Sequence, residues 1–273
     1  MKTINPKDIS PVQLQQVMQT AVSPRPIALA STVDENGNPN LSPFSFFNMF
    51  STVPPILIFS PARRVRDNTT KHTLENVMKV PEVVIGTVNF PIVQQISLSS
   101  TEYEDGVNEF LKAGLTMKDA DTVQPKLIAE SPVNFECKVL EIKHLGTEGG
   151  AGNLLICEVQ KIHVREEYCD ENGHLDQTKL DMVARLGANW YSISNKESLF
   201  EVPKPLVTKG IGFDQLPENI RYSKIFTGND LGMLANIEEL PGTEFFGEED
   251  KHLEAQKLLL ESKIKEAWEV LKK

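Results

Sequence analysis

The sequence predicts a mainly β protein: a closed antiparallel barrel with short helical inserts, followed by a C-terminal helical extension. Short apolar runs are separated by hairpin signals such as Asn36-Gly37 and the Gly-rich stretch 146–152. These runs do not alternate regularly with helical patterns, which disfavours a parallel nucleotide-binding sheet. Beyond residue 195 the periodicity weakens, so we predict a barrel over 1–195 and an extension over 196–273.

The barrel elements are predicted from their patterns and from the residues that bound them. The Asn36-Gly37 turn joins the first two strands, and Pro43 places the second at an edge or a bulge. Asn68 or Thr69 is suited to cap the next helix. In order, the predicted elements are a helix (11–21), strands (26–33, 41–47, 56–59), a helix (69–79), a strand (82–89), a helical and turn-rich stretch (91–115), two long strands (133–144, 154–164) and an extended segment (188–193).

The extension is predicted to end in a single helix over 250–272. One apolar stripe at helical spacing supports this helix, formed by Leu253, Leu260, Ile264, Ala267 and Leu271. We expect the extension to pack on the barrel or on a partner subunit, as a lid or a dimer clamp.

Composition excludes several classes of protein. The net charge of −10 disfavours binding to nucleic acid or to an anionic membrane, since both need clustered Lys and Arg. A charge-free stretch over 36–62 contains too many prolines to span a membrane as a helix. Three cysteines and no apolar leader predict a reducing, cytoplasmic setting, and no residue spacing suggests a metal site.

The first segment that could carry chemistry is a local reversal of charge over 61–72. Four cations, Arg63, Arg64, Arg66 and Lys71, stand there against one acid, Asp67. Guanidinium groups, hydroxyls and the free N–H groups of a helix start form an anion site suited to phosphate. The alternative is a solvated loop whose arginines pair with surface acids.

Two further segments could line a pocket for an aromatic ligand. Over 41–50, four phenylalanines lie among small hydroxyl and amide residues, so the strand edge could offer backbone groups to a flat heteroaromatic ring. The alternative is ordinary core packing. Over 184–191, an arginine beside a glycine and two aromatics could complete a pocket wall, or could be a turn entering a strand.

Seven motifs follow one another along the chain. They are Ser23-Pro24-Arg25-Pro26-Ile27-Ala28, Ser31-Thr32-Val33, the run Asn40 to Asn48, Pro54-Pro55, Lys71-His72-Thr73-Leu74-Glu75-Asn76, the run Ser131 to Cys137, and Ala184-Arg185-Leu186-Gly187. This ordered set resembles the flavin reductase-like, FMN-binding split-barrel family, and its flavoredoxin group in particular. The resemblance covers about residues 20–195. His72 stands where the family usually has Asp, and Ala188 where a second Gly is common.

The resemblance implies a six-stranded split barrel, a homodimer, and FMN bound near the dimer interface. Carried over by position, the residues at the flavin would be Ser31, Thr32, Ser45, Phe46, Phe47 and Asn48. Those at the phosphate would be Ser60, Arg66, Lys71 and Thr73, with Arg63 and Arg64 competing for the role of Arg66, and those closing the site would be Arg185, Leu186 and Gly187.

The expected activity is that of an oxidoreductase in which NAD(P)H passes a hydride to bound FMN. No side chain need act as an acid or base, because the cofactor supplies the chemistry. One alternative is an FMN-binding electron carrier or redox sensor without its own nicotinamide site. Another is a relative on the same barrel that binds pyridoxamine phosphate or haem. The acceptor could be a further protein, and the sequence leaves NADH and NADPH equally open.

Overall fold

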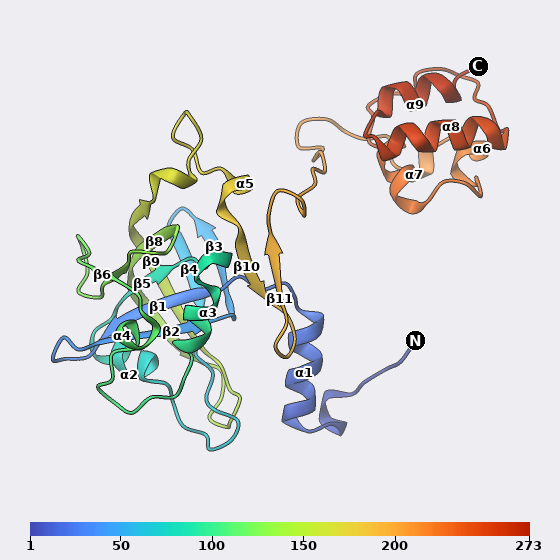
Figure 1. The fold of residues 1–273 in the computed structure, drawn as a ribbon. Helices are drawn as coiled ribbons and strands as arrows, with labels where there is room; N and C mark the ends of the chain where they lie inside the picture. The colour runs from blue at the N-terminus through green and yellow to red at the C-terminus, as the bar shows by residue number, and fades with distance from the viewer. The chain divides into compact units, whose positions relative to one another are not determined.

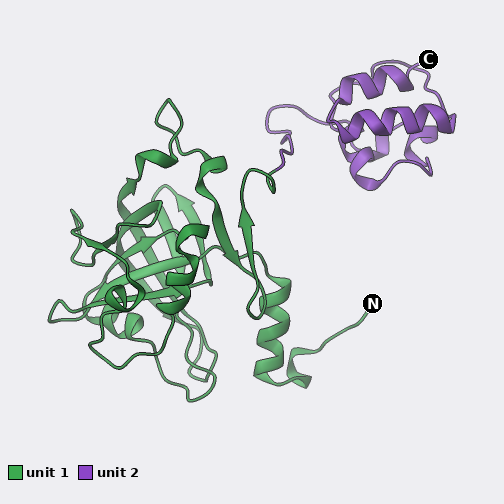
Figure 2. Cartoon of the chain, viewed as in Figure 1, with its two compact units in different colours: residues 1–199 green, residues 200–273 purple.

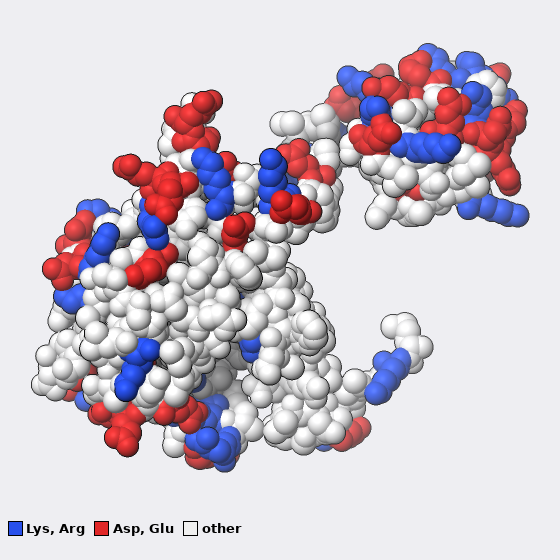
Figure 3. All heavy atoms as spheres, in the orientation of Figure 1, with Lys and Arg blue, Asp and Glu red and all other residues white.

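The chain forms two compact units in the computed structural model, which describes residues 1–273. Unit 1 comprises Met1–Leu199 and unit 2 comprises Phe200–Lys273, and each has its own core (Figure 2). The predicted boundary at 195/196 lies four residues earlier. Acidic and basic side chains are interspersed on the visible surface of both units (Figure 3). No helix is long and apolar enough to cross a membrane.

Unit 1 is built on a seven-stranded sheet in which every neighbouring pair is antiparallel (Figure 1). The strand order is β2-β1-β5-β8-β9-β4-β3, which is one strand more than the six that the family resemblance implies. The strands are β1 (Ala28–Val33), β2 (Pro39–Phe44), β3 (Phe47–Thr52), β4 (Pro55–Phe59), β5 (Glu82–Gly86), β8 (Val133–His144) and β9 (Asn153–Val164). The predicted Asn36-Gly37 turn is confirmed: it joins β1 to β2, and Gly37 has a φ of 82° there.

The two edges of this sheet are joined by only two residues, Ser45 and Phe46. A flat sheet of seven strands would separate its edges by about 29 Å. The three Cα steps from β2 to β3 span at most about 11 Å. The sheet must therefore curl until its edges meet. No ladder joins β2 to β3, so the closure is a seam, as in a split barrel, and the expected fold class is confirmed.

Two apolar clusters lie on opposite faces of the curled sheet. Along β1, Ala28 and Ala30 belong to one cluster and Leu29 to the other, because successive strand residues point to opposite faces. The cluster with Ala28 draws on six strands and on helix α2, and fills the barrel interior. The other is covered by α3, α4 and the small strands β7 and β10.

Short helices and two small sheets complete unit 1. The helices are η1 (Pro6–Asp8), α1 (Pro11–Ala21), α2 (His72–Lys79), η2 (Phe90–Ile92), α3 (Val93–Leu98), α4 (Glu109–Ala113), η3 (Glu166–Tyr168) and α5 (Gln177–Leu180). The small sheets pair β6 (Met117–Lys118) with β7 (Leu127–Ile128), and β10 (Met182–Arg185) with β11 (Tyr191–Ser194).

Two predictions for this unit are wrong. The expected strand 41–47 ends at Phe44, because the chain turns at Ser45-Phe46 and begins β3 at Phe47. The cap of α2 is Lys71, not Asn68 or Thr69. Asp67 accepts a hydrogen bond from the Thr69 N–H at 3.1 Å, which holds the residues before the helix in a turn.

Unit 2 is helical: η4 (Phe213–Gln215), α6 (Glu218–Arg221), α7 (Gly228–Leu234), α8 (Glu249–Leu260) and α9 (Ile264–Leu271). The predicted single helix 250–272 is wrong, because the chain breaks at Ser262, whose φ is 59°. The break changes which residues face the core of unit 2. Leu260, which belongs to the predicted apolar stripe, is 78% exposed, while Leu259, Trp268 and Leu271 are buried.

Candidate functional site

A cavity of about 390 Å³ opens at the seam between β2 and β3. Four segments that are distant in sequence meet there: α1, the seam, the loop after β4, and the segment after α3. The lining residues are Gln15, Gln19, Pro43, Phe44, Ser45, Phe46, Ser60, Ala62, Arg63, Arg64, Val65, Arg66, Lys71 and Glu102. The structure thus brings together five of the predicted residues: Ser45, Phe46, Ser60, Arg66 and Lys71.

The basic loop 61–71 is held in place by the tip of the β8–β9 hairpin. Arg63 donates its N–H to the Ala151 carbonyl at 2.8 Å, and Gly150 donates to the Arg63 carbonyl at 3.0 Å. A methyl group on Gly149 would lie 3.0 Å from the Arg64 carbonyl oxygen, so this contact favours glycine. The Gly-rich hairpin tip is therefore a brace for the cation loop.

Lys71 is the cation of this cavity whose charged group has neither a hydrogen-bond partner nor an ion-pair partner. It is the N-cap residue of α2, and no side chain caps that helix. Its ammonium lies 5.9 Å from the centre of the Phe44 ring and forms no hydrogen bond or ion pair. Burial lowers the pKa of Lys71, and the nearby Arg64 charge lowers it further. A half-buried, unpaired cation beside free helix N–H groups is an anion-binding arrangement.

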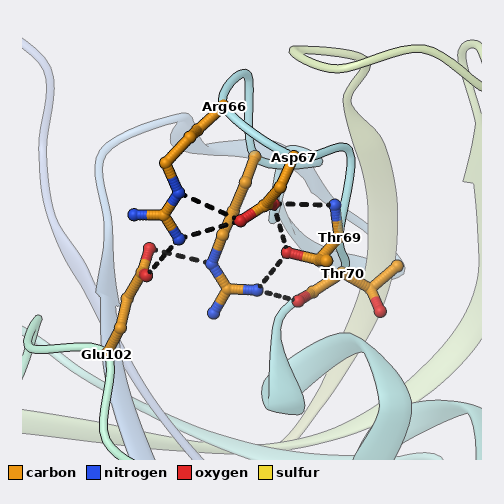
Figure 4. A network of polar contacts seen from close by, with 6 residues as sticks. Arg66, Asp67, Thr69, Thr70 and Glu102 are labelled. Atoms are coloured by element: carbon orange, nitrogen blue, oxygen red, sulfur yellow. Dashed lines mark hydrogen bonds and ion pairs between the residues drawn. The ribbon is translucent and has the colours of Figure 1, made fainter.

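The three arginines of the loop are held by different partners. Arg63 donates to the Asn68 side chain at 2.6 Å. Arg64 and Arg66 both bind the carboxylate of Glu102, each at 2.9 Å (Figure 4). Arg66 also pairs with Asp67 at 2.8 Å and is 72% exposed. Glu102 was not predicted, because it lies 36 residues beyond Arg66 and no local pattern marks it.

Three other predicted residues lie behind the cavity, not in its wall. Ser31, Thr32 and Thr73 are buried. The Thr73 hydroxyl donates to Asn40 Oδ1 at 3.0 Å, and the Asn40 amide donates to the Glu109 carboxylate at 2.9 Å. Burial raises the pKa of Glu109. This buried network fixes the start of α2, and hence Lys71, against β2.

The last two predicted seam residues lie on β3. Phe47 packs against the barrel interior and pairs with Phe59. Asn48 is exposed, and its side chain accepts the N–H of Met49 at 2.8 Å. Neither residue lines the cavity.

An apolar groove of about 470 Å³ continues from the cavity along α1. The two share Gln15, Gln19, Phe46 and Val65. The groove adds the apolar side chains Pro11, Leu14, Met18 and Val22 from α1 and its C-cap. Sequence reasoning predicted this helix and missed its place in the site, since its residues carry no chemical signal of their own.

The residues predicted to close the site, Arg185, Leu186 and Gly187, contact α1 and the segment that follows it. Arg185 exchanges two backbone hydrogen bonds with Arg25, at 2.9 and 2.8 Å, and the Leu186 carbonyl accepts the Arg25 guanidinium at 2.8 Å. Gly187 packs against Thr20, where an added methyl group would lie 2.3 Å from the hydroxyl oxygen. The Arg185 side chain itself lines a separate cavity and stacks 4.6 Å from the ring of Tyr191.

Seam, cation cavity and apolar groove lie in one split-barrel unit, and their chemistry is suited to an anion joined to a flat apolar group. Comparison with known proteins extends this description. The Flavin reductase like domain family matches residues 20–179. An uncharacterized protein of Halalkalibacterium halodurans is 31% identical over 208 residues, 76% of this chain and 98% of that protein.

Solved structures share this fold, among them the following two. Nitrilotriacetate monooxygenase component B from Bacillus cereus has a TM-score of 0.69 at 24% identity, covering 74% of this chain and 98% of that chain. Flavoredoxin of Desulfovibrio vulgaris has a TM-score of 0.56 at 19% identity, covering 68% and 93%. The chain belongs to the flavin reductase-like family, a class of flavin-binding oxidoreductases.

Proposed function

We propose that the chain is an NAD(P)H-dependent flavin reductase that binds FMN at the β2–β3 seam. The observation that carries the proposal is Lys71, a half-buried ammonium without an acceptor at the uncapped start of α2. A phosphate monoester supplies the missing anion. The neighbouring apolar groove has the character needed for the isoalloxazine ring.

In this proposal the chain's residues bind and orient. Lys71 and the loop arginines hold the phosphate, with the Ser45 hydroxyl at the seam. Phe46 and Met18 exclude water from the ring, and Gln15 and Gln19 offer amide groups where the groove joins the cavity. FMN, when bound, supplies the hydride-accepting chemistry. Thr32 and Thr73 act indirectly, through the network that fixes Lys71.

An anaerobic titration tests the nicotinamide dependence. Protein loaded with FMN is mixed with NADPH or NADH while the blue absorption of the flavin is followed. We expect the absorption to bleach within seconds with at least one donor. Flavin that stays oxidised with both would overturn the reductase activity, and would favour an FMN-binding electron carrier or redox sensor reduced by another protein.

We also propose that the protein is a homodimer. Exposed apolar side chains gather on α1 and on the edge strand β3, including Met18 (55% exposed), Met49 (65%) and Phe50 (64%). An edge strand with exposed apolar residues is unusual in a free monomer. Sedimentation of the full chain is expected to give a dimer, and a monomer at micromolar concentration with full FMN occupancy would contradict this. The lid or clamp role of 196–273 stays a prediction.

A further inference from the structure

Glu102 reaches the cation cavity from a distant part of the chain. It lies between α3 and α4, in a segment without helix or strand. One carboxylate oxygen accepts from Arg64 Nε and the other from an Arg66 amino group, both at 2.9 Å (Figure 4). Its side chain is 45% exposed and has no other partner. The carboxylate is therefore held by cations of the cavity alone.

Glu102 also affects the protonation of Lys71, another cation of the cavity. Burial and Arg64 lower the pKa of Lys71, and the charge of Glu102 opposes them and raises it. Glu102 lines both the cavity at the β2–β3 seam and a small polar pocket beside His72 and Thr73. It thus stands where an anionic ligand would meet the same cations.

A guanidinium group binds a carboxylate and a phosphate through the same fork of N–H donors. The donors of Arg64 and Arg66 that hold Glu102 are consequently not free for a phosphate, and the same Arg66 amino group also donates to Asp67, at 2.8 Å. We propose that Glu102 is an internal competitor for the phosphate site, which the FMN phosphate displaces from both arginines. Glu102 then sets how strongly the protein prefers FMN to riboflavin, an inference that rests on the proposed flavin site.

The variant Glu102→Gln tests this competition, with dissociation constants for FMN and riboflavin measured by quenching of flavin fluorescence. Loss of two partly exposed ion pairs predicts that FMN binds roughly three- to tenfold more tightly. Riboflavin, which has no phosphate, should bind as it does to the native protein. Glu104→Gln is the matched control, because Glu104 is exposed in the same segment and forms no ion pair.

The direction in which the FMN affinity of Glu102→Gln changes tests the proposed competition. Weaker or unchanged FMN binding in Glu102→Gln would overturn the proposal, since Glu102 would then orient the arginines or be irrelevant to them. An equal change for FMN and riboflavin would overturn it as well. Native protein that binds neither flavin would instead refute the flavin site itself, so the two failures are distinguishable.

Discussion

Replacing Lys71 by Met is expected to weaken FMN binding by about 1–3 kcal/mol, the contribution of a charge-assisted hydrogen bond. Methionine keeps an unbranched side chain of nearly the same length near the Phe44 ring and removes the ammonium group. Because Lys71 has no internal partner, its loss should leave no buried acid unpaired. The free energy of unfolding without flavin should therefore change little. Equilibrium dialysis with FMN and a denaturant titration measure the two quantities.

The matched control is Lys79→Met at the other end of α2. Lys79 is 58% exposed and pairs only with Glu35, at 2.9 Å. The Lys79→Met variant should bind FMN as tightly as the native protein does. Equal FMN affinity in the Lys71 and Lys79 variants would remove Lys71 from the phosphate site.

Replacing Glu136 by Ala is expected to destabilise unit 1 by about 1–3 kcal/mol, the cost of leaving hydrogen-bonding groups without their acceptor. Glu136 is fully buried in β8 and accepts the N–H groups of Asp121 at 2.8 Å and Thr122 at 2.6 Å. His163 lies 2.5 Å away. Alanine would remove the one acceptor that Asp121, Thr122 and His163 share. Thermal or denaturant unfolding measures the loss, and Glu141→Ala, exposed on the same strand, is the control.

The Glu136 carboxyl should also make the stability of unit 1 depend on pH. Burial alone would raise the pKa of Glu136, but the hydrogen bonds from Asp121, Thr122 and His163 hold it at about 2, below the ordinary 4.5. A carboxyl with a lowered folded-state pKa contributes stability above its unfolded pKa and loses it as pH falls. The Glu136 contribution should therefore vanish between about 4.5 and 2. A Glu136→Ala variant whose stability falls between these pH values as much as that of the native protein would contradict this role.

Local signals in the sequence predicted much of unit 1. The Asn36-Gly37 turn is set by residues that tolerate a positive φ, and the cation loop is a local excess of charge before a helix. Each signal lies within a few residues, so tertiary structure was not needed to interpret it. The same stretch predicts a helix start close to Lys71, although the cap, Lys71 itself, lies two to three residues beyond the predicted Asn68 or Thr69.

Features that depend on tertiary contacts could not be predicted. Ser45 and Phe46 look like the middle of a strand, and only the curled sheet makes them a turn between its two edges. Glu102 and the α1 residues reach the cavity from other segments. Thr73 matches the motif of a phosphate-binding helix, yet its hydroxyl is turned to Asn40, a contact that depends on how α2 packs on β2.

A crystal structure of the FMN-loaded protein shows directly where the flavin binds. We expect the phosphate to contact the Lys71 ammonium at the β2–β3 seam, with the isoalloxazine ring extending toward α1. Flavin bound elsewhere, for example in the cavity of about 390 Å³ lined by Arg185 and Tyr191, would contradict it.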